Sequence, residues 1–306
     1  MWQVGLDIGG TKMAAIALDG TGAEYRRWRL ATEKSSYEAF LEGVARLVAT
    51  IRHDLAAPFS LGIALPGSVS PQTGCIRNAN ILVLNGRPLA ADLMACLGQP
   101  VVLANDANCF ALSEARDGAG AGYSSVFGVT LGTGCGGGLV IHQQLITGGY
   151  GNAAECGHIP LPGYSPAFDG PDVRCYCGQD NCVEGFVSGT GLALGYQRLT
   201  GNACNAEVVV ARALAGEAAA LQQVGRFRDQ LARTLGTIIN LVDPAVIVLG
   251  GGLSQVSILV DDLAALVAPR VFTDNYCTPI VTANYGASSG MRGAAWLGQQ
   301  GNGLRA

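Results

Sequence analysis

The chain has little charge and no excess of basic residues. Its 19 Lys and Arg residues stand against 23 Asp and Glu residues, which gives a net charge of −4. Proteins that bind nucleic acids neutralise phosphates with clustered Lys and Arg. The acidic balance therefore argues against a nucleic-acid partner and favours a small neutral or anionic ligand.

The chain also lacks a long uncharged apolar run, although 49% of its 306 residues are hydrophobic. Asp243 and Asp261 interrupt the most apolar region, so no stretch reaches the roughly 18 residues that a membrane-spanning helix needs. The N-terminus has no basic segment, and Asp7 lies inside its first apolar run, which argues against a secretory signal. We expect a cytoplasmic protein with no membrane contact and enough apolar residues for two lobes.

The many glycines gather at a few points instead of forming a low-complexity linker. Residues 2–20, WQVGLDIGGTKMAAIALDG, are typical of a strand, a tight turn and a second strand. Residues 124–144, SSVFGVTLGTGCGGGLVIHQQ, repeat that pattern and indicate an internal duplication. Glycine amides can approach a phosphate without a Cβ in the way, so two such turns could hold one nucleotide across a cleft. A single glycine turn is more often only a turn, and neither matches the P-loop pattern.

Apolar periodicity predicts an α/β alternation around these turns. We expect a helix over 36–55 with a Ser35–Glu38 capping box, and strands over 60–65 and 101–106. Further expected elements are helices over 107–116, 221–241 and 289–297 and strands over 245–252 and 279–283. The predicted lobes are 1–117 with 289–306, and 118–288, with a cleft between them.

Two further groups of residues are candidates for the chemistry. Asp7 could hold Mg²⁺ through water beside the first turn. Asn105 and Asp106 follow a predicted strand, where a helix cap is a more frequent role than catalysis. A glycosidase that uses Asp106 and Glu155 as paired carboxylates is conceivable, but it leaves the glycine turns without a purpose.

Ten cysteines in a chain with no export signal are better interpreted as reduced thiols than as a disulfide framework. His158, Cys175, Cys177 and Cys182 have the residue types of a tetrahedral zinc site, with Gly178 in a tight turn between the thiols. Buried thiols and a disulfide remain alternatives. A Cys₃His site has no open position, so such a zinc ion would be structural.

Six motifs together resemble the ROK family of sugar kinases and related repressors. They are DIGGTK at the start, ANDANCFALSEA at 104–115, LGTGCGGG at 131–138, ECGH at 155–158, CYCGQDNCVE at 175–184 and VDPAVIVLGGGLS at 242–254. The resemblance runs nearly end to end. It implies a two-lobed actin/hexokinase-like, duplicated ribonuclease H-like α/β fold with an interlobe cleft, and a homodimer.

The resemblance also implies roles for residues, by matching each motif position. The phosphate and adenosine positions are Asp7, Gly9, Gly10, Thr11, Lys12, Gly132, Thr133, Gly134, Gly250, Gly251 and Gly252. The sugar positions are Gly67, Asn80, Asn105, Asp106, Glu155, His158 and Glu184, with Asp106 as general base. The zinc ligands are His158, Cys175, Cys177 and Cys182, with the second ring nitrogen of His158 free for a sugar hydroxyl. Three positions depart from the pattern, because Ala154 and Asn181 stand where glycine is usual and Cys156 stands where an aromatic residue is usual.

The implied activity is transfer of the γ-phosphoryl group of ATP, with Mg²⁺, to O6 of a hexose. The segment LPGSVSPQTGCIRNANILVLNGRPL, 65–89, is similar to the sugar-side loop of the family's fructokinases, so D-fructose is the first expectation, with mannose or glucose as secondary substrates. N-acetylglucosamine kinase and glucokinase are the alternatives. A repressor carries a DNA-reading domain before its first phosphate loop, and here that loop begins at Asp7, so we do not expect a repressor.

Overall fold

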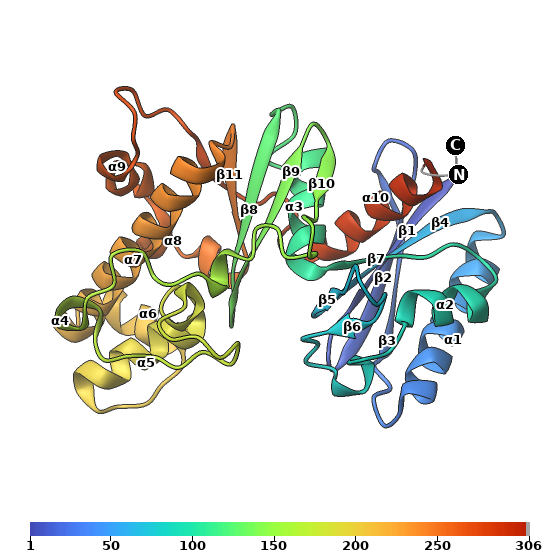
Figure 1. The fold of residues 1–306 in the computed structure, drawn as a ribbon, viewed down its shortest axis with the longest axis horizontal. Helices are drawn as coiled ribbons and strands as arrows, with labels where there is room; N and C mark the ends of the chain where they lie inside the picture. The colour runs from blue at the N-terminus through green and yellow to red at the C-terminus, as the bar shows by residue number, and fades with distance from the viewer. Residues whose placement is uncertain (304–306) are drawn as a thin grey trace. The chain divides into compact units, whose positions relative to one another are not determined.

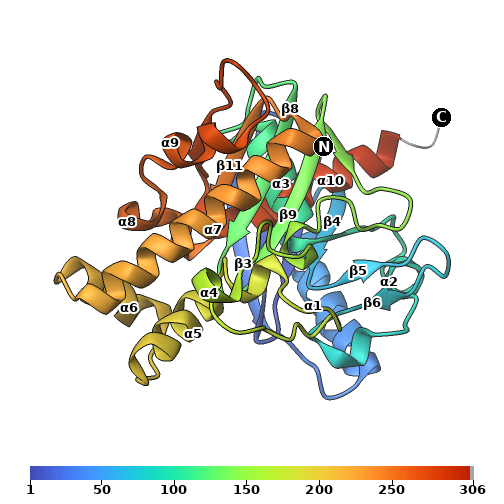
Figure 2. The same cartoon turned by 60° about the vertical axis from the view of Figure 1, so that its left-hand side comes forward.

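The computed structural model describes residues 1–303, with side chains through residue 299, as two compact units (Figures 1 and 2). Unit 1 comprises Met1–Gly122, Gly138–Ala153 and the segment from Ala287 onward. Unit 2 comprises Tyr123–Gly137 and Ala154–Gly286. The units differ from the expected lobes chiefly in Gly138–Ala153, which belongs to unit 1.

Unit 1 is built on a five-stranded sheet in the order β3-β2-β1-β4-β7. The strands are β1 (Trp2–Ile8), β2 (Lys12–Leu18), β3 (Glu24–Ala31), β4 (Phe59–Leu65) and β7 (Val102–Asn105). β1, β2 and β3 form an antiparallel meander, whereas β4 and β7 run parallel to β1. The carboxyl ends of β1, β4 and β7 therefore lie at one edge of the sheet.

Helix α1 (Tyr37–Leu55) covers one face of this sheet with α2 (Leu89–Leu97), and their side chains share a core with Val4, Leu6 and Ile8. The apolar stripe expected on α1 is buried. The expected Ser35–Glu38 capping box is wrong by one residue: the cap is Ser36, whose hydroxyl accepts a hydrogen bond from the amide of Ala39 at 3.1 Å. The hydroxyl must lie beside the first free amides of the helix, and only Ser36 does so.

The opposite face is covered by α3 (Asp106–Arg116) and α10 (Ser289–Gly303). Residues alternate across a strand, so Gly5 faces away from the Val4 and Leu6 core. A Cβ on Gly5 would lie 1.9 Å from the backbone oxygen of Met291, and a Cβ on Gly62 would lie 1.9 Å from that of Ala294. These glycines allow the backbone of α10 to lie directly on β1 and β4. A short two-stranded sheet, β5 (Ser68–Val69) with β6 (Ile76–Arg77), and the 3₁₀ turn Leu82–Leu84 complete the unit.

The second sheet repeats the order of the first, as β10-β9-β8-β11-β12. Its strands are β8 (Ser125–Leu131), β9 (Cys135–Ile141), β10 (Gln144–Ile146), β11 (Val246–Gly250) and β12 (Ile280–Thr282). β11 is parallel to both β8 and β12. The repeated strand, glycine turn and strand in the sequence is thus the start of two similar sheets.

Helices of unit 2 include α5 (Gly189–Thr200), α6 (Ala206–Leu214) and the long α7 (Ala218–Val242). Shorter helical segments are α4 (Pro166–Asp169), α8 (Ser257–Val260), α9 (Leu263–Val267) and the 3₁₀ turns Cys156–His158, Val183–Gly185, Gly252–Gln255, Ala268–Arg270 and Gly286–Ser288. Among the helices of residues 1–303, none combines the length and the apolar character that crossing a bilayer requires.

Candidate active site

Two carboxylates meet at the carboxyl edge of the unit 1 sheet. Asp7 is the next-to-last residue of β1, and Asp106 is the first residue of α3, directly after β7. The pKa of Asp7 is raised from 3.8 to about 6, chiefly by loss of solvent contact and then by the nearby charge of Asp106, while Lys12 opposes the change. The two carboxylates repel each other, and a bound cation would offset this repulsion.

The backbone holds Asp106 in a fixed orientation. Its Oδ1 accepts a hydrogen bond from the amide of Ala107 at 2.8 Å, and burial raises its pKa. Asn105 is the helix cap, since its Oδ1 also accepts from the amide of Ala107, at 2.8 Å, and its Nδ2 donates to the oxygen of Gly67 at 3.2 Å. Asn105 thus caps the helix, which leaves the carboxylate of Asp106 available for a role in the chemistry.

The first glycine turn lies between β1 and β2 and is open. The amide of Gly9 donates to the oxygen of Lys12 at 2.9 Å, and the hydroxyl of Thr32 donates to the oxygen of Gly9 at 2.7 Å. A Cβ on Gly10 would meet no atom within 4 Å, and Thr11 and Lys12 are exposed. The turn therefore leaves space beside Asp7 for a phosphate group.

The predicted sugar-side loop follows β4. Gly67 has φ +90°, and a Cβ there would lie 2.6 Å from the oxygen of Arg77. The side chain of Asn85 closes the loop by bonding both the amide and the oxygen of Ala79, each at 2.9 Å. Asn80 is exposed beside this closure. The guanidinium of Arg77 bonds the oxygen of Tyr150 and Oδ1 of Asn152, which joins the unexpected segment 138–153 to the loop.

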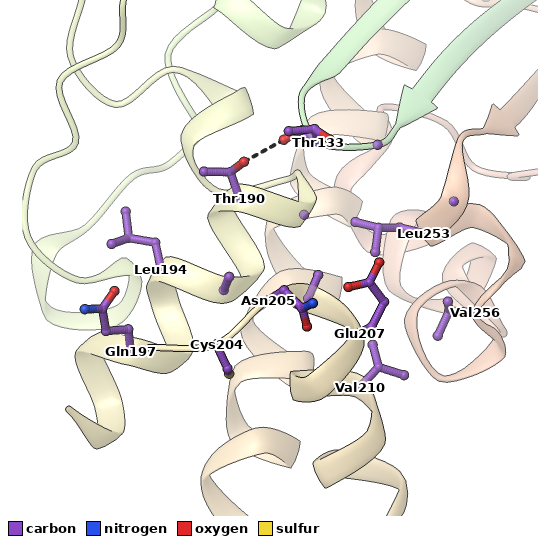
Figure 3. A pocket seen from close by; sticks show the side chains of 15 residues that line it. Thr133, Thr190, Leu194, Gln197, Cys204, Asn205, Glu207, Val210, Leu253 and Val256 are labelled. Carbon is purple, nitrogen blue, oxygen red and sulfur yellow. Dashed lines mark hydrogen bonds between the residues drawn. The ribbon is translucent and has the colours of Figure 1, made fainter. Parts of the chain in front are cut away.

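In unit 2 the second glycine turn borders a pocket of about 850 Å³ (Figure 3). The amide of Gly189, at the start of α5, donates to the oxygen of Gly132 at 2.7 Å. The hydroxyl of Thr190 donates to the oxygen of Thr133 at 2.9 Å, as the dashed line in Figure 3 shows. The N-terminal turn of α5 thus holds this turn in place.

The pocket brings together two of the three predicted glycine groups, since Gly132 and Thr133 line it with Gly252. Gly250 ends β11, and Gly251 has φ +81° with a Cβ position 2.4 Å from the oxygen of Leu131, so it shapes the backbone behind the pocket. The sequence did not point to the other lining residues, which come from α5, α6 and the turn after β11. These are Gly189, Thr190, Ala193, Leu194, Gln197, Cys204, Asn205, Ala206, Glu207, Val210, Leu253 and Val256.

This pocket is lined by the second glycine turn and by mostly apolar side chains, with Thr133, Thr190, Gln197, Asn205 and Glu207 as polar groups. Oδ1 of Asn205 caps α6 by accepting from the amide of Val208 at 3.0 Å. The residue composition and size of the pocket suit a nucleotide, with phosphates at the glycine turn and the base against the apolar side chains. No local sequence signal marks these residues, because packing of distant helices creates the pocket.

The predicted zinc ligands converge. One ligand atom from each of His158, Cys175, Cys177 and Cys182 lies within 4.8 Å of all the others. Sγ of Cys175 is 3.6 Å from Nδ1 of His158, and Sγ of Cys177 is 3.5 Å from Sγ of Cys182. Zinc bonds of about 2.3 Å to sulfur and about 2.0 Å to nitrogen require ligand atoms about 3.5–3.8 Å apart in a tetrahedron. The set fits a zinc ion, and all four residues have the right donor atoms.

The 3.5 Å between Sγ of Cys177 and Sγ of Cys182 is too long for an S–S bond of about 2.05 Å, and all ten cysteines are free thiols in the structure. The turn between the thiols is tight, as expected: Gly178 has φ +93°, and its amide donates to the oxygen of Cys175 at 3.0 Å. One expectation is wrong. Nε2 of His158 is not free, since it lies 2.9 Å from the hydroxyl of Tyr176, a neighbour of two ligands whose role the spacing did not suggest.

The two predicted sugar carboxylates of unit 2 flank the zinc set. Glu155 comes directly before the 3₁₀ turn Cys156–His158, and Glu184 lies within the turn Val183–Gly185. Both are partly exposed. Oε2 of Glu184 accepts a hydrogen bond from the amide of Cys135 at 2.9 Å. The zinc segment therefore brings a carboxylate to the second glycine turn.

The departures from the family pattern have clear structural settings. Ala154 has φ +65° and Asn181 has φ +59°, in the left-handed region that favours glycine. Asn181 compensates with its side chain, which accepts from the amide of Val173 and donates to Asp172, both at 2.9 Å. Cys156 is buried, and its hydrogen bond to Cys135, together with burial, raises the pKa of the Cys135 thiol.

Comparisons with known proteins show which family the sequence matches. The model of the ROK family matches residues 3–301. An N-acetyl-D-glucosamine kinase of Salmonella gallinarum is 41% identical over 96% of this chain and 98% of the relative, and that of Salmonella heidelberg is 40% identical over the same shares.

Solved structures show the same fold. The ROK hexokinase of Thermus thermophilus has a TM-score of 0.87 at 26% identity, over 99% of this chain and 100% of that one. A ROK glucokinase of Streptomyces griseus, solved with glucose and AMPPNP, has a TM-score of 0.79 at 27% identity, over 98% and 100%. The predicted hexokinase-like α/β fold is confirmed by these structures. With a family model that spans almost every residue and relatives that match from end to end, the chain belongs to the ROK family and is one of its sugar kinases.

Proposed function

We propose that the protein is an ATP-dependent N-acetyl-D-glucosamine kinase that phosphorylates O6 of the sugar. The carboxylates of Asp7 and Asp106 at the carboxyl edge of the unit 1 sheet, with the open turn at Gly10 directly after β1, carry the phosphoryl-transfer part of the proposal. Phosphoryl transfer needs positioning, neutralised phosphate charge and a base for the attacking hydroxyl. The choice of sugar rests on the 40–41% identical relatives, which are N-acetyl-D-glucosamine kinases.

Asp106 acts as the base in this proposal. The amide of Ala107 holds Oδ1, so Oδ2 can accept the proton of the sugar hydroxyl, and the raised pKa of Asp106 makes it a better proton acceptor. Asp7 would hold Mg²⁺ through water, and the ion would offset the charge of the phosphates. The amides of Gly10 and Thr11 in the first turn and of Thr133 and Gly134 in the second would bind phosphate oxygens, and the 850 Å³ pocket would take the adenosine.

His158 and Cys175, Cys177 and Cys182 would hold a structural zinc ion. By fixing the segment that contains Glu155 and Glu184, the site orients these carboxylates for sugar hydroxyls. With Nε2 of His158 engaged by Tyr176, a sugar hydroxyl must compete with the Tyr176 hydroxyl or bind through it. Gly67, Asn80 and Asn105 stay predicted sugar contacts. The homodimer and the cytoplasmic location stay predictions.

D-fructose, the first expectation, has weaker support than N-acetylglucosamine. It rests on the likeness of the 65–89 segment to a sugar-side loop, whereas the alternative rests on matches over whole chains. Sugars that differ by one polar group can be distinguished by orders of magnitude when a buried partner is left unpaired. We propose that polar contacts of this kind decide the preference.

A coupled assay of ADP release over N-acetylglucosamine, fructose, mannose and glucose tests the proposal. We expect the highest kcat/KM with N-acetylglucosamine and a product phosphorylated at O6 by nuclear magnetic resonance. A higher kcat/KM with fructose would restore the first expectation. ADP release with none of these sugars, in protein that binds them, would favour a non-catalytic sugar-responsive regulator instead.

A further inference from the structure

Glu184 connects two parts of unit 2 that the proposed function uses for different substrates. Its backbone lies two residues after Cys182 in the zinc set, and its carboxylate reaches the second glycine turn. There Oε2 accepts from the amide of Cys135 at 2.9 Å, directly after Gly134. Within residues 1–303, the other oxygen, Oε1, makes no hydrogen bond, and so it can accept one from a sugar hydroxyl.

The glycine turn is shaped to receive this carboxylate. A Cβ on Gly134 would lie 2.4 Å from Oε2 of Glu184, whereas a Cβ on Gly132, two residues earlier, would meet nothing within 4 Å. Neither glycine has a positive φ. Gly134 therefore has no side chain because Glu184 approaches it, and not because the turn needs a special backbone conformation.

A second contact joins the same two segments. The hydroxyl of Ser188 donates to the backbone oxygen of Glu184 at 2.7 Å and caps α5 by accepting from the amide of Gly191 at 3.0 Å. The start of α5 holds Gly132 and Thr133 through Gly189 and Thr190. Glu184 is thus connected to the turn in two ways, directly through its carboxylate and indirectly through the start of α5.

We propose that Glu184 couples the two substrates: a sugar bound to Oε1 fixes the carboxylate, which fixes the glycine turn that binds the nucleotide phosphates. The inference rests on the proposed kinase function. Sugar should then tighten nucleotide binding, and by linkage nucleotide should tighten sugar binding by the same factor. Removing zinc should weaken the coupling as well, because Cys182 no longer anchors the Val183–Gly185 turn.

Calorimetry of AMPPNP binding with Mg²⁺, with and without saturating N-acetylglucosamine, measures the coupling factor. We expect sugar to tighten nucleotide binding by about fivefold or more, at the lower end of usual couplings. Gly134→Ala should bring the factor close to 1, because the added methyl displaces Oε2. Gly132→Ala is the matched control, with the same change in the same turn, and should keep the factor even where it alters nucleotide affinity.

Glu184→Gln retains an oxygen that can accept from the Cys135 amide and should keep part of the coupling, whereas Glu184→Ala should lose it. Chelation of zinc from the unsubstituted protein should lower the factor, measured as nucleotide affinity and not as activity. If Gly134→Ala and Gly132→Ala weaken nucleotide binding and leave the same factor as the unsubstituted protein, Glu184 has only a local structural role.

The two proposals fail in different ways. A protein that phosphorylates a sugar but binds AMPPNP equally well with and without that sugar contradicts the coupling and leaves the kinase function intact. A protein that releases no ADP with any sugar contradicts the kinase function, and the coupling falls with it.

Discussion

The two glycine turns have the same place in similar sheets and different surroundings. The turn at Gly9–Thr11 is open: Gly10 has no neighbour within 4 Å of its Cβ position, and among the described residues Thr32 is the one whose side chain bonds to the turn. The turn at Gly132–Gly134 is supported by Glu184 and by the start of α5. The carboxylate of Asp7, whose pKa is raised, lies beside the first turn, and a largely apolar pocket lies beside the second.

This difference indicates that the two similar halves of the fold have different functions. Acidic groups whose pKa is raised by burial suit the chemical step, which needs a cation and a base. A turn that is held by a carboxylate and by the start of a helix suits binding, because a preorganised site loses less entropy when the nucleotide binds. Variants in unit 1 should therefore affect kcat most, and variants in unit 2 should affect binding and stability.

The largest expected effect is that of Asp106→Asn. The amide keeps the shape and the contact with Ala107 but cannot accept the proton, so kcat should fall by at least about a hundredfold. Sugar binding, measured by calorimetry, should persist. Glu42→Gln, on the exposed face of α1, is the control and should be unchanged. Near-normal turnover in Asp106→Asn would assign the base to another residue.

The next effect tests the support of the second turn. Cys177→Ser removes one ligand of the zinc set, so bound zinc measured by mass spectrometry should fall from about one ion per chain to near none. Sugar KM should rise more than the KM for ATP. Cys96→Ser is the matched control, an exposed free thiol on α2 outside the set. An unsubstituted protein that is fully active without zinc would contradict this account of the cluster.

Elements and motifs with local signals could be predicted from the sequence. The strand, turn and strand over residues 2–20 and the buried stripe of α1 follow from periodicity, and the start of α3 was expected at Ala107, one residue after its observed start at Asp106. The zinc set was identified because His158 and three thiols are rare residue types gathered in one short segment. The donor atoms alone left buried thiols possible, and the observed 3.5–3.6 Å separations fit a zinc ion.

Long-range packing could not be predicted. The adenosine-sized pocket depends on α5 and α6 lying against the turn at Gly252, and Glu207 and Asn205 have no motif that marks them. The engagement of His158 by Tyr176 and of Cys135 by Glu184 depends on side-chain directions that spacing does not contain. Segment 138–153 is bonded to the rest of unit 1 by Arg77, whose guanidinium donates to Tyr150 and Asn152, more than 70 positions later in the chain.

A smaller effect concerns stability, because the charged carboxylate of Asp7 beside the first turn destabilises the folded protein. The pKa of Asp7 is about 6 in the folded protein against an ordinary 3.8, so folding disfavours its charged form. The resulting destabilisation is absent below pH 3.8 and complete above about pH 6, where it amounts to about 2–3 kcal/mol.

Asp7→Asn should therefore raise the free energy of unfolding at pH 8, with a smaller gain at pH 5, while lowering kcat. In the unsubstituted protein kcat/KM should fall as the pH drops below about 6, because Asp7 becomes protonated. Asp19→Asn is the contrasting variant: hydrogen bonds from Thr21 lower the pKa of Asp19, so its loss should not stabilise the protein. Denaturant unfolding at both pH values measures the difference, and equal gains for the two variants would contradict the role of burial.

The smallest expected effect lies in the segment that supports the second turn. Ala154 has φ +65°, where a Cβ costs about 1 kcal/mol, so Ala154→Gly should raise the free energy of unfolding by up to that amount. Asn181→Gly tests the same conformation with a different outcome, because it removes the hydrogen bonds to Val173 and Asp172 and should destabilise the protein. If both variants were stabilising, the backbone conformation alone would set the preference for glycine at these positions. Opposite signs mean that Asn181 replaces glycine by means of its side chain, whereas Ala154 only tolerates the strain.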